Sequence, residues 1–444
     1  MRLFGMSRGE IETKVKSRDL TICVFGLGKM GLPIACAFAD AGFKVIGVDV
    51  EPTVVDNVNS GKTWFQELEL DEKLSEAVVK GKLTATSDGA RGARESDFIV
   101  CIVPLFLDDN KKADLSSIVQ VAKTLSKNLK KGQVISFETT MPIGTTENLL
   151  KPILEKSGLM AGKDFGLVYA PERLMSGHVF RRLKELKKII GGINEKSSFI
   201  ASEIYKTIHP AGTDVVKNPR TAEMAKLAAG IWRDVNIAFA NEMAKIADEY
   251  CIDIEEVISE VNTSPRRMML NPGCGVGGHC IPVYPYFFIN RVTSDIPLIE
   301  AARKTNQSMP GYTVSLAEEE LKKRGKEIAG STVVVLGLAF RPYIREVANS
   351  PTLDMVKILK QKGAEVYVFD PLFTKEEVEK ITGAKSRELD KILKEADCVI
   401  ISTMYRELEK VEEKPSRAYL IIDGRNQLKN ADRGIGRRYG SKLI

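Results

Sequence analysis

Short apolar runs alternate with segments of helical composition along the first half of the chain. The strand-like runs lie at residues 21–25, 45–49, 97–103 and 133–138. This alternation is typical of a parallel β-sheet that is covered by helices on both faces. We therefore predict an α/β fold with a doubly wound domain over residues 21–215, preceded by an N-terminal arm or helix over residues 1–20.

The same pattern recurs in the last third of the chain. Strand-like runs lie there at residues 332–337, 366–370, 398–401 and 420–423. The first run leads to Gly337 and the second to Asp370, as in the first domain, but a complete phosphate-binding glycine pattern is missing. We predict a second doubly wound domain over residues 311–444 that holds a different nucleotide.

Residues 216–310 carry no strand signal. Within this segment, residues 223–250 are rich in Ala, Met and Ile and contain no proline. We expect one long helix there, which joins the two α/β domains as part of a helical middle domain. A helix of this length serves either as a dimerisation surface or as a spacer within one chain. We expect a homodimer or an oligomer built from dimers.

Composition narrows the class of protein. At 444 residues the chain exceeds the size of one hydrophobic core, and its 43% hydrophobic residues are ordinary for a globular protein. The net charge of +6 comes from dispersed basic residues without interleaved aromatic residues. An anionic small molecule is therefore a better candidate partner than a nucleic acid.

Two further features bear on the compartment. No apolar run reaches the length of a membrane span, and residues 1–19 lack the apolar stretch of a signal peptide. Most of the seven cysteines lie in apolar runs and are expected to be buried thiols, namely Cys23, Cys36, Cys101 and Cys398. We expect a cytoplasmic protein, because free thiols persist in a reducing compartment.

A glycine-rich turn follows the first predicted strand. Gly26, Gly28 and Gly31 have the spacing Gly-x-Gly-x-x-Gly, and Asp49 ends the second strand. In a Rossmann-like domain this arrangement places a pyrophosphate at a helix N-terminus, and the acid binds the adenosine ribose hydroxyls. The acid favours NAD over NADP, because it repels a 2′-phosphate. The alternative is a glycine-rich turn in an unrelated α/β domain.

A second glycine-rich segment ends in a cysteine. Residues 272–282 read Pro-Gly-Cys-Gly-Val-Gly-Gly-His-Cys-Ile-Pro, and the second cysteine is Cys280. Glycines let the backbone approach a ligand closely, so we expect this thiol to be presented to a ligand. A structural cysteine in the core is the alternative. A presented thiol together with a hydride-accepting cofactor suggests an oxidation that passes through a covalent thioester.

These segments belong to a set of motifs that occur in a fixed order. They are Gly26-x-Gly28-x-x-Gly31, residues 138–146 (ETTMPIGTT), 169–173 (YAPER), 222–227 (AEMAKL), the Cys280 segment and residues 337–342 (GLAFRP). In them the chain resembles the UDP-glucose/GDP-mannose dehydrogenase family, from residue 21 to about residue 428. The resemblance implies an NAD-binding domain, a helical middle domain and a UDP-sugar-binding domain. It also implies metal-independent oxidation of the C6 alcohol of a UDP-sugar to a carboxylate by two NAD⁺.

Two segments narrow the resemblance. Residues 232–242 and 277–282 are similar to the branch of the family that acts on UDP-N-acetylhexosamines. The substrate that this branch implies is UDP-N-acetyl-D-mannosamine. UDP-glucose and UDP-N-acetylglucosamine are the alternatives.

The resemblance also implies catalytic residues. Cys280 matches the nucleophile, and Lys226 matches a lysine whose charge stabilises an oxyanion and helps to ionise the thiol. Thr140 and Glu172 match groups that assist water or proton transfer. From the residues alone, a solvated charge is the preferred interpretation of Lys226, because Lys245 on the same helix looks no different. For Glu172, a surface salt bridge is the less favoured alternative.

Further positions match binding residues of the family. Besides the glycine turn and Asp49, the resemblance implies NAD contacts at Pro104, Thr140 and Arg345. It implies contacts with the UDP-sugar at Gly277, Gly278, Arg341 and Arg425. Arg266 is similar to an arginine that a neighbouring subunit contributes, which implies a substrate site completed by dimerisation.

Two catalytic positions depart from the family pattern. Gly230 stands where the family usually has Asn, and Tyr284 stands where it usually has Asp. The nucleophile and the lysine are intact, so we keep the interpretation as an enzyme. We expect Glu172, and after it Asp234, to take over part of the hydrolysis.

Two other classes of function remain open. A two-electron dehydrogenase of the hydroxyacid type shares the first domain and a catalytic lysine, but it needs neither Cys280 nor the second nucleotide domain. A nucleotide-sugar-binding protein without activity is favoured only by Gly230 and Tyr284. The number of NADH molecules formed per UDP-sugar separates them, because full oxidation gives two, a simple dehydrogenase gives one and a binding protein gives none.

Overall fold

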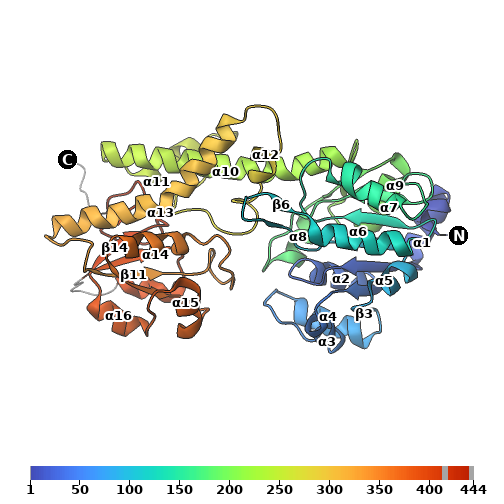
Figure 1. The fold of residues 1–444 in the computed structure, drawn as a ribbon, viewed down its shortest axis with the longest axis horizontal. Helices are drawn as coiled ribbons and strands as arrows, with labels where there is room; N and C mark the ends of the chain where they lie inside the picture. The colour runs from blue at the N-terminus through green and yellow to red at the C-terminus, as the bar shows by residue number, and fades with distance from the viewer. Residues whose placement is uncertain (1, 413–418, 440–444) are drawn as a thin grey trace. The chain divides into compact units, whose positions relative to one another are not determined.

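The computed structural model describes residues 2–412 and 419–439. The chain forms two compact units, one that ends at Ala228 and one that begins at Ala229 (Figure 1). Each unit contains a β-sheet with its own hydrophobic core. None of the helices in the described part of the chain combines the length and the apolar character that a membrane span requires.

An eight-stranded sheet forms the centre of the first unit, in the order β10-β9-β8-β7-β4-β1-β2-β3. Its strands are β1 Thr21–Phe25, β2 Lys44–Val48, β3 Leu83–Thr86, β4 Phe98–Cys101, β7 Val134–Phe137, β8 Gly166–Tyr169, β9 Lys188–Gly192 and β10 Thr213–Val216. Neighbouring strands are parallel, apart from the antiparallel pair of β8 and β9. The predicted doubly wound sheet is confirmed, and its order reverses at β1, where sheets of this type bind ligands beyond their carboxyl ends.

Side chains of a single strand contribute to two separate cores. In β1, Ile22 and Val24 pack into one core, and Cys23 and Phe25 pack into the other, because successive side chains of a strand point to opposite faces. Helices cover both faces, which explains why the strand is apolar throughout. The helices are α1 Arg8–Ser17, α2 Gly31–Asp40, α3 Pro52–Asn59, α4 Leu70–Val79, α5 Gly89–Glu95, α6 Ser116–Asn128, α7 Lys151–Glu155, α8 Val179–Glu185 and α9 Glu195–Lys206. Shorter elements are η1 Leu3–Gly5, η2 Thr146–Leu150, β5 Phe106–Leu107 and β6 Ala113–Asp114.

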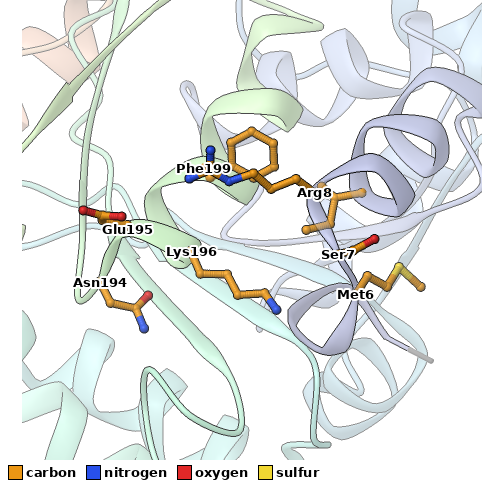
Figure 2. A pocket seen from close by; sticks show the side chains of 8 residues that line it. Met6, Ser7, Arg8, Asn194, Glu195, Lys196 and Phe199 are labelled. Carbon is orange, nitrogen blue, oxygen red and sulfur yellow. The ribbon is translucent and has the colours of Figure 1, made fainter.

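The N-terminal segment packs onto this unit as a capped helix. Ser7 and Glu10 exchange hydrogen bonds between side chain and backbone at the start of α1, which satisfies two free N–H groups. Leu3 and Ile11 are fully buried in the core that also contains β1. Figure 2 shows the hollow between α1 and α9, which is lined by Met6, Ser7, Arg8, Ile11, Asn194, Glu195, Lys196 and Phe199. This lining, drawn from the described residues, includes none of the site residues predicted from the sequence.

Helix α10 spans Pro219–Tyr250. The helix expected over residues 223–250 is thus present and begins one turn earlier. Pro219 is tolerated at its first position, because the first N–H groups of a helix have no partner within the helix. The boundary between the two units lies inside this helix, after Ala228.

A five-stranded parallel sheet forms the centre of the second unit, in the order β12-β11-β13-β14-β15. Its strands are β11 Thr332–Leu336, β12 Glu365–Phe369, β13 Cys398–Ile401, β14 Leu420–Asp423 and β15 Arg433–Gly434. The other elements are α11 Ile254–Asn262, α12 Tyr286–Ile289, α13 Pro297–Lys323, α14 Pro351–Gln361, α15 Lys375–Thr382, α16 Leu389–Glu395 and η3 Arg406–Glu412. The four strand-like runs of the C-terminal third correspond to β11, β12, β13 and β14, whereas β15 has no signal in the sequence.

Helix α13 passes through the position at which the sequence analysis separates the middle domain from the last domain. Its residues Val314 and Leu321 are buried in the same core as Val333 of β11. The helix and the last sheet therefore share one core, and residues 310 and 311 lie inside a continuous helix. The domain boundaries drawn from the sequence stay predictions.

Candidate active site

The glycine turn after β1 has the geometry that a dinucleotide requires. Gly26 has a φ of +92°, and a Cβ at this position would lie 2.8 Å from the carbonyl oxygen of Ile102. A Cβ at Gly31, the first residue of α2, would lie only 1.8 Å from the carbonyl oxygen of Gly26. A Cβ at Gly28 would meet no atom within 4 Å. Two glycines are thus required for packing, and the third leaves open space near the N-terminus of α2, where a pyrophosphate binds in such folds.

Asp49 follows β2 and lies beside this turn. One carboxylate oxygen accepts a hydrogen bond from the backbone N–H of Leu27 at 2.8 Å, and the other accepts one from Glu51 at 3.0 Å. A carboxylate has about four acceptor positions, so two such bonds orient the group and leave capacity for ribose hydroxyls. This geometry supports the predicted role of Asp49.

The segment that contains Thr140 is held by a glutamate of α10. Glu223 is fully buried and accepts hydrogen bonds from the backbone N–H groups of Gly144 at 2.5 Å and Thr146 at 2.9 Å. It also accepts the hydroxyl of Thr146 at 2.7 Å. Burial raises the pKa of Glu223, although these hydrogen bonds oppose the shift. The sequence motif contains Glu223, but the sequence analysis assigned it no role.

Two predicted contacts of the cofactor lie close to the same segment. The hydroxyl of Thr139 donates to the carbonyl oxygen of Val103 at 2.7 Å, and this bond ties the Thr140 segment to the end of β4. Pro104 comes next in the chain and is exposed. The structure therefore brings Pro104 and Thr140 to neighbouring strand ends, as the resemblance implies.

Lys226 lies one turn after Glu223, and positions three apart share a face of a helix. Its ammonium group donates a hydrogen bond to the backbone carbonyl oxygen of Glu172, and its side chain is partly buried. A purely solvated charge, the alternative that the sequence left open, does not describe this contact. Lys226 and Glu172 are brought together, although the contact uses the backbone of Glu172.

The carboxylate of Glu172 is held inside the fold. It accepts the backbone N–H groups of Arg173 at 2.5 Å and Leu174 at 2.7 Å, and the ammonium group of Lys188 at 2.7 Å. Burial opposes ionisation, but Lys188 and the hydrogen bonds outweigh it and lower the pKa of Glu172 to about 2. The alternative interpretation of Glu172 as part of a surface salt bridge is therefore wrong, because only 9% of its side chain is exposed. A carboxylate of such low pKa is a weak proton acceptor, which disfavours the expected role in activating water.

A second buried carboxylate shares the same lysine. Glu138 is fully buried, and Lys188 contacts it at 2.6 Å. The hydroxyl of Tyr205 also donates to Glu138. Burial raises the pKa of Glu138 to about 7, with a further contribution from the nearby charge of Glu172. Lys188 was not among the residues predicted from the sequence. The available signal was a lysine at the start of an otherwise apolar strand.

In the second unit, Cys280 is exposed and begins a turn. Its carbonyl oxygen accepts the backbone N–H groups of Val283 at 3.1 Å and Tyr284 at 2.9 Å. Cys274 in the same glycine-rich segment is buried, and its thiol contacts the carbonyl oxygen of Ser402 at 3.6 Å. Of the two thiols, Cys280 is therefore the one that is presented, as the sequence predicts.

The two glycines before Cys280 pack against the segment that follows β11. A Cβ at Gly277 would lie 2.5 Å from the Cβ of Phe340, and Gly278 has a φ of +96°. The backbone N–H of Gly278 donates to Ala348 at 2.7 Å. Arg341 lies in the same segment, with its guanidinium 5.9 Å from the centre of the Phe340 ring. These contacts bring Gly277, Gly278 and Arg341 together at the carboxyl end of β11.

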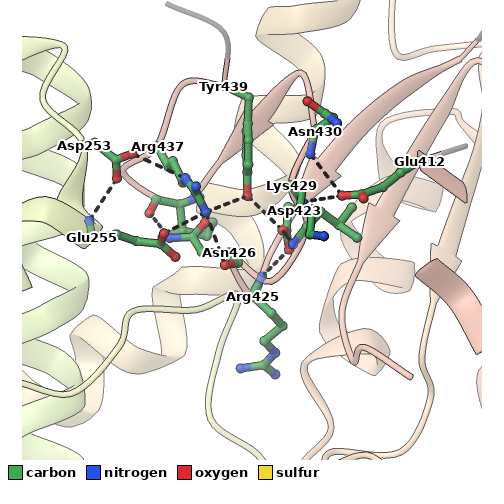
Figure 3. Close-up of polar contacts among 12 residues, drawn as sticks. Asp253, Glu255, Glu412, Asp423, Arg425, Asn426, Lys429, Asn430, Arg437 and Tyr439 are labelled. Carbon is green, nitrogen blue, oxygen red and sulfur yellow. Dashed lines mark hydrogen bonds and ion pairs between the residues drawn. The ribbon is translucent and has the colours of Figure 1, made fainter. Parts of the chain in front are cut away.

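Arg425 connects the sheet to the glycine-rich segment. Its side chain donates to the carbonyl oxygens of Ser402 at 2.6 Å and Gly275 at 3.2 Å. Its backbone N–H donates to Asp423 at 3.0 Å, and Tyr439 donates to the same carboxylate at 2.9 Å (Figure 3). Ser402 and Arg425 follow β13 and β14, so the predicted substrate residues gather at the carboxyl ends of neighbouring strands, where open α/β sheets bind ligands.

Three further residues complete the set that was predicted from the sequence. Arg345 forms an ion pair with Glu377 and lies over the ring of Phe373 at 4.9 Å, and its contact with NAD stays a prediction. Arg266 is exposed, as a contribution to another subunit requires. Asp234 is buried and paired with Arg303 at 2.8 Å. The expectation that Asp234 assists hydrolysis is disfavoured, because this carboxylate is held in the core.

These features define a protein with two nucleotide-binding α/β sheets and a presented thiol. The chain belongs to the UDP-glucose/GDP-mannose dehydrogenase family. The NAD binding domain of the family matches residues 20–209, the central domain matches residues 220–308 and the UDP binding domain matches residues 334–430. The matches confirm the predicted family, the NAD cofactor of the first domain and the UDP-binding character of the last.

Individual relatives are similar over nearly their whole length. A UDP-N-acetyl-D-mannosamine dehydrogenase of Pyrococcus horikoshii is 37% identical over 94% of this chain and 99% of its own. An NDP-N-acetyl-D-galactosaminuronic acid dehydrogenase of Ralstonia nicotianae is 34% identical over 91% of this chain and 95% of its own. The solved structure of a UDP-D-ManNAc dehydrogenase of Pyrococcus horikoshii has a TM-score of 0.86 and 35% identity, and covers 94% of this chain and 99% of its own.

Proposed function

We propose that this chain oxidises the C6 alcohol of a UDP-sugar to a carboxylate with two NAD⁺, and that the sugar is N-acetyl-D-mannosamine. The observation that carries the proposal is the exposed Cys280 at the head of a turn, next to glycines that pack on the segment of Arg341. The names of the similar proteins support the choice of sugar.

The residues of the first unit fit the proposed cofactor. Gly28 leaves space at the N-terminus of α2 for a pyrophosphate, and Asp49 is oriented beside it for the ribose. Bound NAD⁺ would supply the hydride acceptor. The absence of a cation at position 49 favours NAD over NADP.

In the proposed reaction Cys280 acts first as the nucleophile and later as the leaving group. Loss of a proton and a hydride converts the C6 alcohol to an aldehyde, and the Cys280 thiolate adds to its carbonyl carbon to form a thiohemiacetal. Loss of the hydroxyl proton and of a second hydride, to a second NAD⁺, would give a thioester. Water then adds to the thioester, the carbon–sulfur bond breaks, and the carboxylate and the free thiol are released. Lys226 is proposed, from its motif, as the cation that stabilises the oxyanion.

A panel of UDP-sugars with NADH detection tests this function. UDP-N-acetyl-D-mannosamine should be the best substrate and should yield two NADH per sugar. Replacement Cys280→Ser should abolish formation of the uronate and preserve binding of the UDP-sugar, because an alcohol is a far weaker nucleophile than a thiolate. Cys274→Ser is the matched control. One NADH per sugar, or full activity of Cys280→Ser, would contradict the thioester path.

The second copy of the chain is the proposed partner of α10. Trp232, Phe239 and Ile246 are each about half exposed and recur at every seventh position, so they share one face of the helix. Exposed apolar side chains in a continuous row are typical of protein interfaces. A dimer on this face agrees with the exposed Arg266, which we propose contributes to the partner's substrate site.

We also propose that the protein works in the cytoplasm. All seven cysteines are free, and five of them are buried. Seven free thiols in one chain agree with a reducing compartment, where disulfides are rare.

A further inference from the structure

Gly230 and Tyr284, the two departures from the family pattern, are in direct contact. A Cβ at position 230 would lie 2.4 Å from Cδ2 and 3.2 Å from Cε2 of the Tyr284 ring. The ring therefore occupies the space of the side chain that position 230 lacks. Glycine inside a helix costs about 1 kcal/mol of stability relative to alanine. Close packing of the Tyr284 ring explains why a glycine is present at position 230 of this helix.

The ring of Tyr284 is buried, and the backbone of this residue is hydrogen-bonded to the residue that carries the nucleophile. The side chain is 7% exposed, and its ring centre lies 5.9 Å from that of Phe287. The backbone N–H of Tyr284 donates to the carbonyl oxygen of Cys280 at 2.9 Å. Tyr284 thus follows Cys280 by one turn, and its ring packs on α10 at Gly230.

The two departures are sterically coupled, and we call this coupling the steric exchange: glycine at position 230 makes room for the ring at position 284. An asparagine at position 230 would place its Cβ 2.4 Å from the Tyr284 ring, which is too close for van der Waals contact, so the aromatic ring in this position and the usual amide exclude each other. A phenol has an ordinary pKa of about 10 and is a hydrogen-bond donor at neutral pH. The exchange thus replaces an amide and a carboxyl group with one side chain that carries a hydrogen-bond donor.

The chemistry at Cys280 requires such a donor. Addition of the thiolate to an aldehyde, and of water to a thioester, each place negative charge on an oxygen attached to the reacting carbon. Glu172 and Asp234, the substitutes expected from the sequence, are held by Lys188 and Arg303. Tyr284 is closer to the thiol along the chain than either of them.

We propose that Tyr284 is a catalytic residue whose hydroxyl donates a hydrogen bond to the oxyanion formed at Cys280, and that Gly230 is the positioning residue that admits its ring. The inference rests on the proposed function. No proton is transferred to the oxyanion in this role, so the tyrosine stays neutral through both additions.

Tyr284→Phe is the direct test, because it removes one oxygen and keeps the ring. We expect kcat for uronate formation to fall about 10²–10³-fold, with KM for the UDP-sugar and the thermal midpoint of unfolding nearly unchanged. Tyr286→Phe is the matched control, since Tyr286 belongs to the same segment and its hydroxyl accepts a hydrogen bond from Gln307 at 2.7 Å. A Tyr284→Phe enzyme with the wild-type kcat would overturn the catalytic role.

Position 230 gives a second test. Gly230→Ala should displace the ring, so kcat should fall as in Tyr284→Phe, and the two changes together should be no worse than either alone, because both remove the same interaction. Gly230→Asn with Tyr284→Asp restores the usual pair and should be more active than Gly230→Asn alone. Equal activity of these last two variants would overturn the steric exchange.

Different experimental results would refute the role of Tyr284 and the proposed function. A wild-type protein that forms no NADH with any UDP-sugar would refute both the function and the catalytic role of Tyr284. An active wild type with a fully active Tyr284→Phe variant would refute the catalytic role alone. The steric exchange can also be tested without an activity assay, by thermal unfolding. Gly230→Ala should lower the thermal midpoint, and adding Tyr284→Ala to that variant should cause little further loss, because the clash with the ring is then removed. Additive losses would overturn it.

Discussion

Replacement of Lys188 by Met tests the buried charges at the edge of the first sheet. Lys188 is 3% exposed and lies between Glu138, which is fully buried, and Glu172, which is 9% exposed. Removing one partner of a buried ion pair typically costs about 3–5 kcal/mol, because the remaining charge has no counterion. We expect a loss in this range near pH 8, where both carboxyl groups should ionise.

The loss should depend on pH in a definite direction. Glu138 has its pKa raised from 4.5 to about 7, so the folded protein holds a proton that the unfolded chain releases. Wild-type stability from this group is present below about pH 4.5 and is lost as the pH rises through about 7, by up to roughly 3 kcal/mol. Glu172 has its pKa lowered to about 2, and its contribution is lost only as the pH falls from about 4.5 toward 2.

Without Lys188, both carboxyl groups should hold protons to higher pH. We therefore expect Lys188→Met to be less destabilising near pH 5.5 than near pH 8, as measured by urea unfolding followed by circular dichroism. Glu138→Gln should flatten the fall in wild-type stability between these pH values. Lys187→Met is the matched control, because Lys187 is 56% exposed and forms a surface pair with Asp214 worth about 1 kcal/mol or less. A loss for Lys188→Met near pH 8 no larger than that of the control would refute this reasoning.

Three further substitutions test individual residues described above. Glu223→Gln should lower the thermal midpoint and kcat, because hydrogen bonds to a charged acceptor contribute about 1.5–3 kcal/mol; an unchanged midpoint would contradict the anchoring of the Thr140 segment. Asp49→Ser should raise the kcat/KM ratio of NADP⁺ to NAD⁺ at least about tenfold, and an unchanged ratio would remove the ribose role. If the protein forms the proposed dimer, Phe239→Glu should convert it to a monomer in sedimentation experiments, because a buried unpaired charge is costly; a dimer that persists in the variant would exclude this face of α10.

Much of the fold follows from local pattern. The run at residues 21–25 is β1 itself, and the long proline-free segment is α10, because continuous apolar runs and helical composition act over a few residues. The antiparallel pair of β8 and β9 was not predicted, since strand direction depends on how distant segments pair. The predicted division at residues 310/311 lies within the span of α13 and stays a prediction. A core shared by a helix and a sheet leaves no mark on the sequence of the helix.

The site was less predictable than the fold. Cys280 and the glycine turn were found because glycines at close backbone approaches leave a visible pattern. Lys188 and Glu223 were missed, since a single charged residue in an apolar segment gives no indication of its partners. The placement of Glu172 and Asp234 could not be anticipated either, because burial and ion pairing are properties of tertiary structure.

The continuity of α13 limits how this chain could be recombined with its relatives. A chimera joined at residue 310 would combine two half-helices of different origin and expose Val314 and Leu321 to an unmatched partner. Exchange of the UDP-binding domain would therefore have to carry the whole of α13 with it. Because Ala240 and Ala244 of α10 line the same core, the part from Ala229 onward is expected to be inherited as one block, and specificity for the sugar is expected to change by substitution within that block.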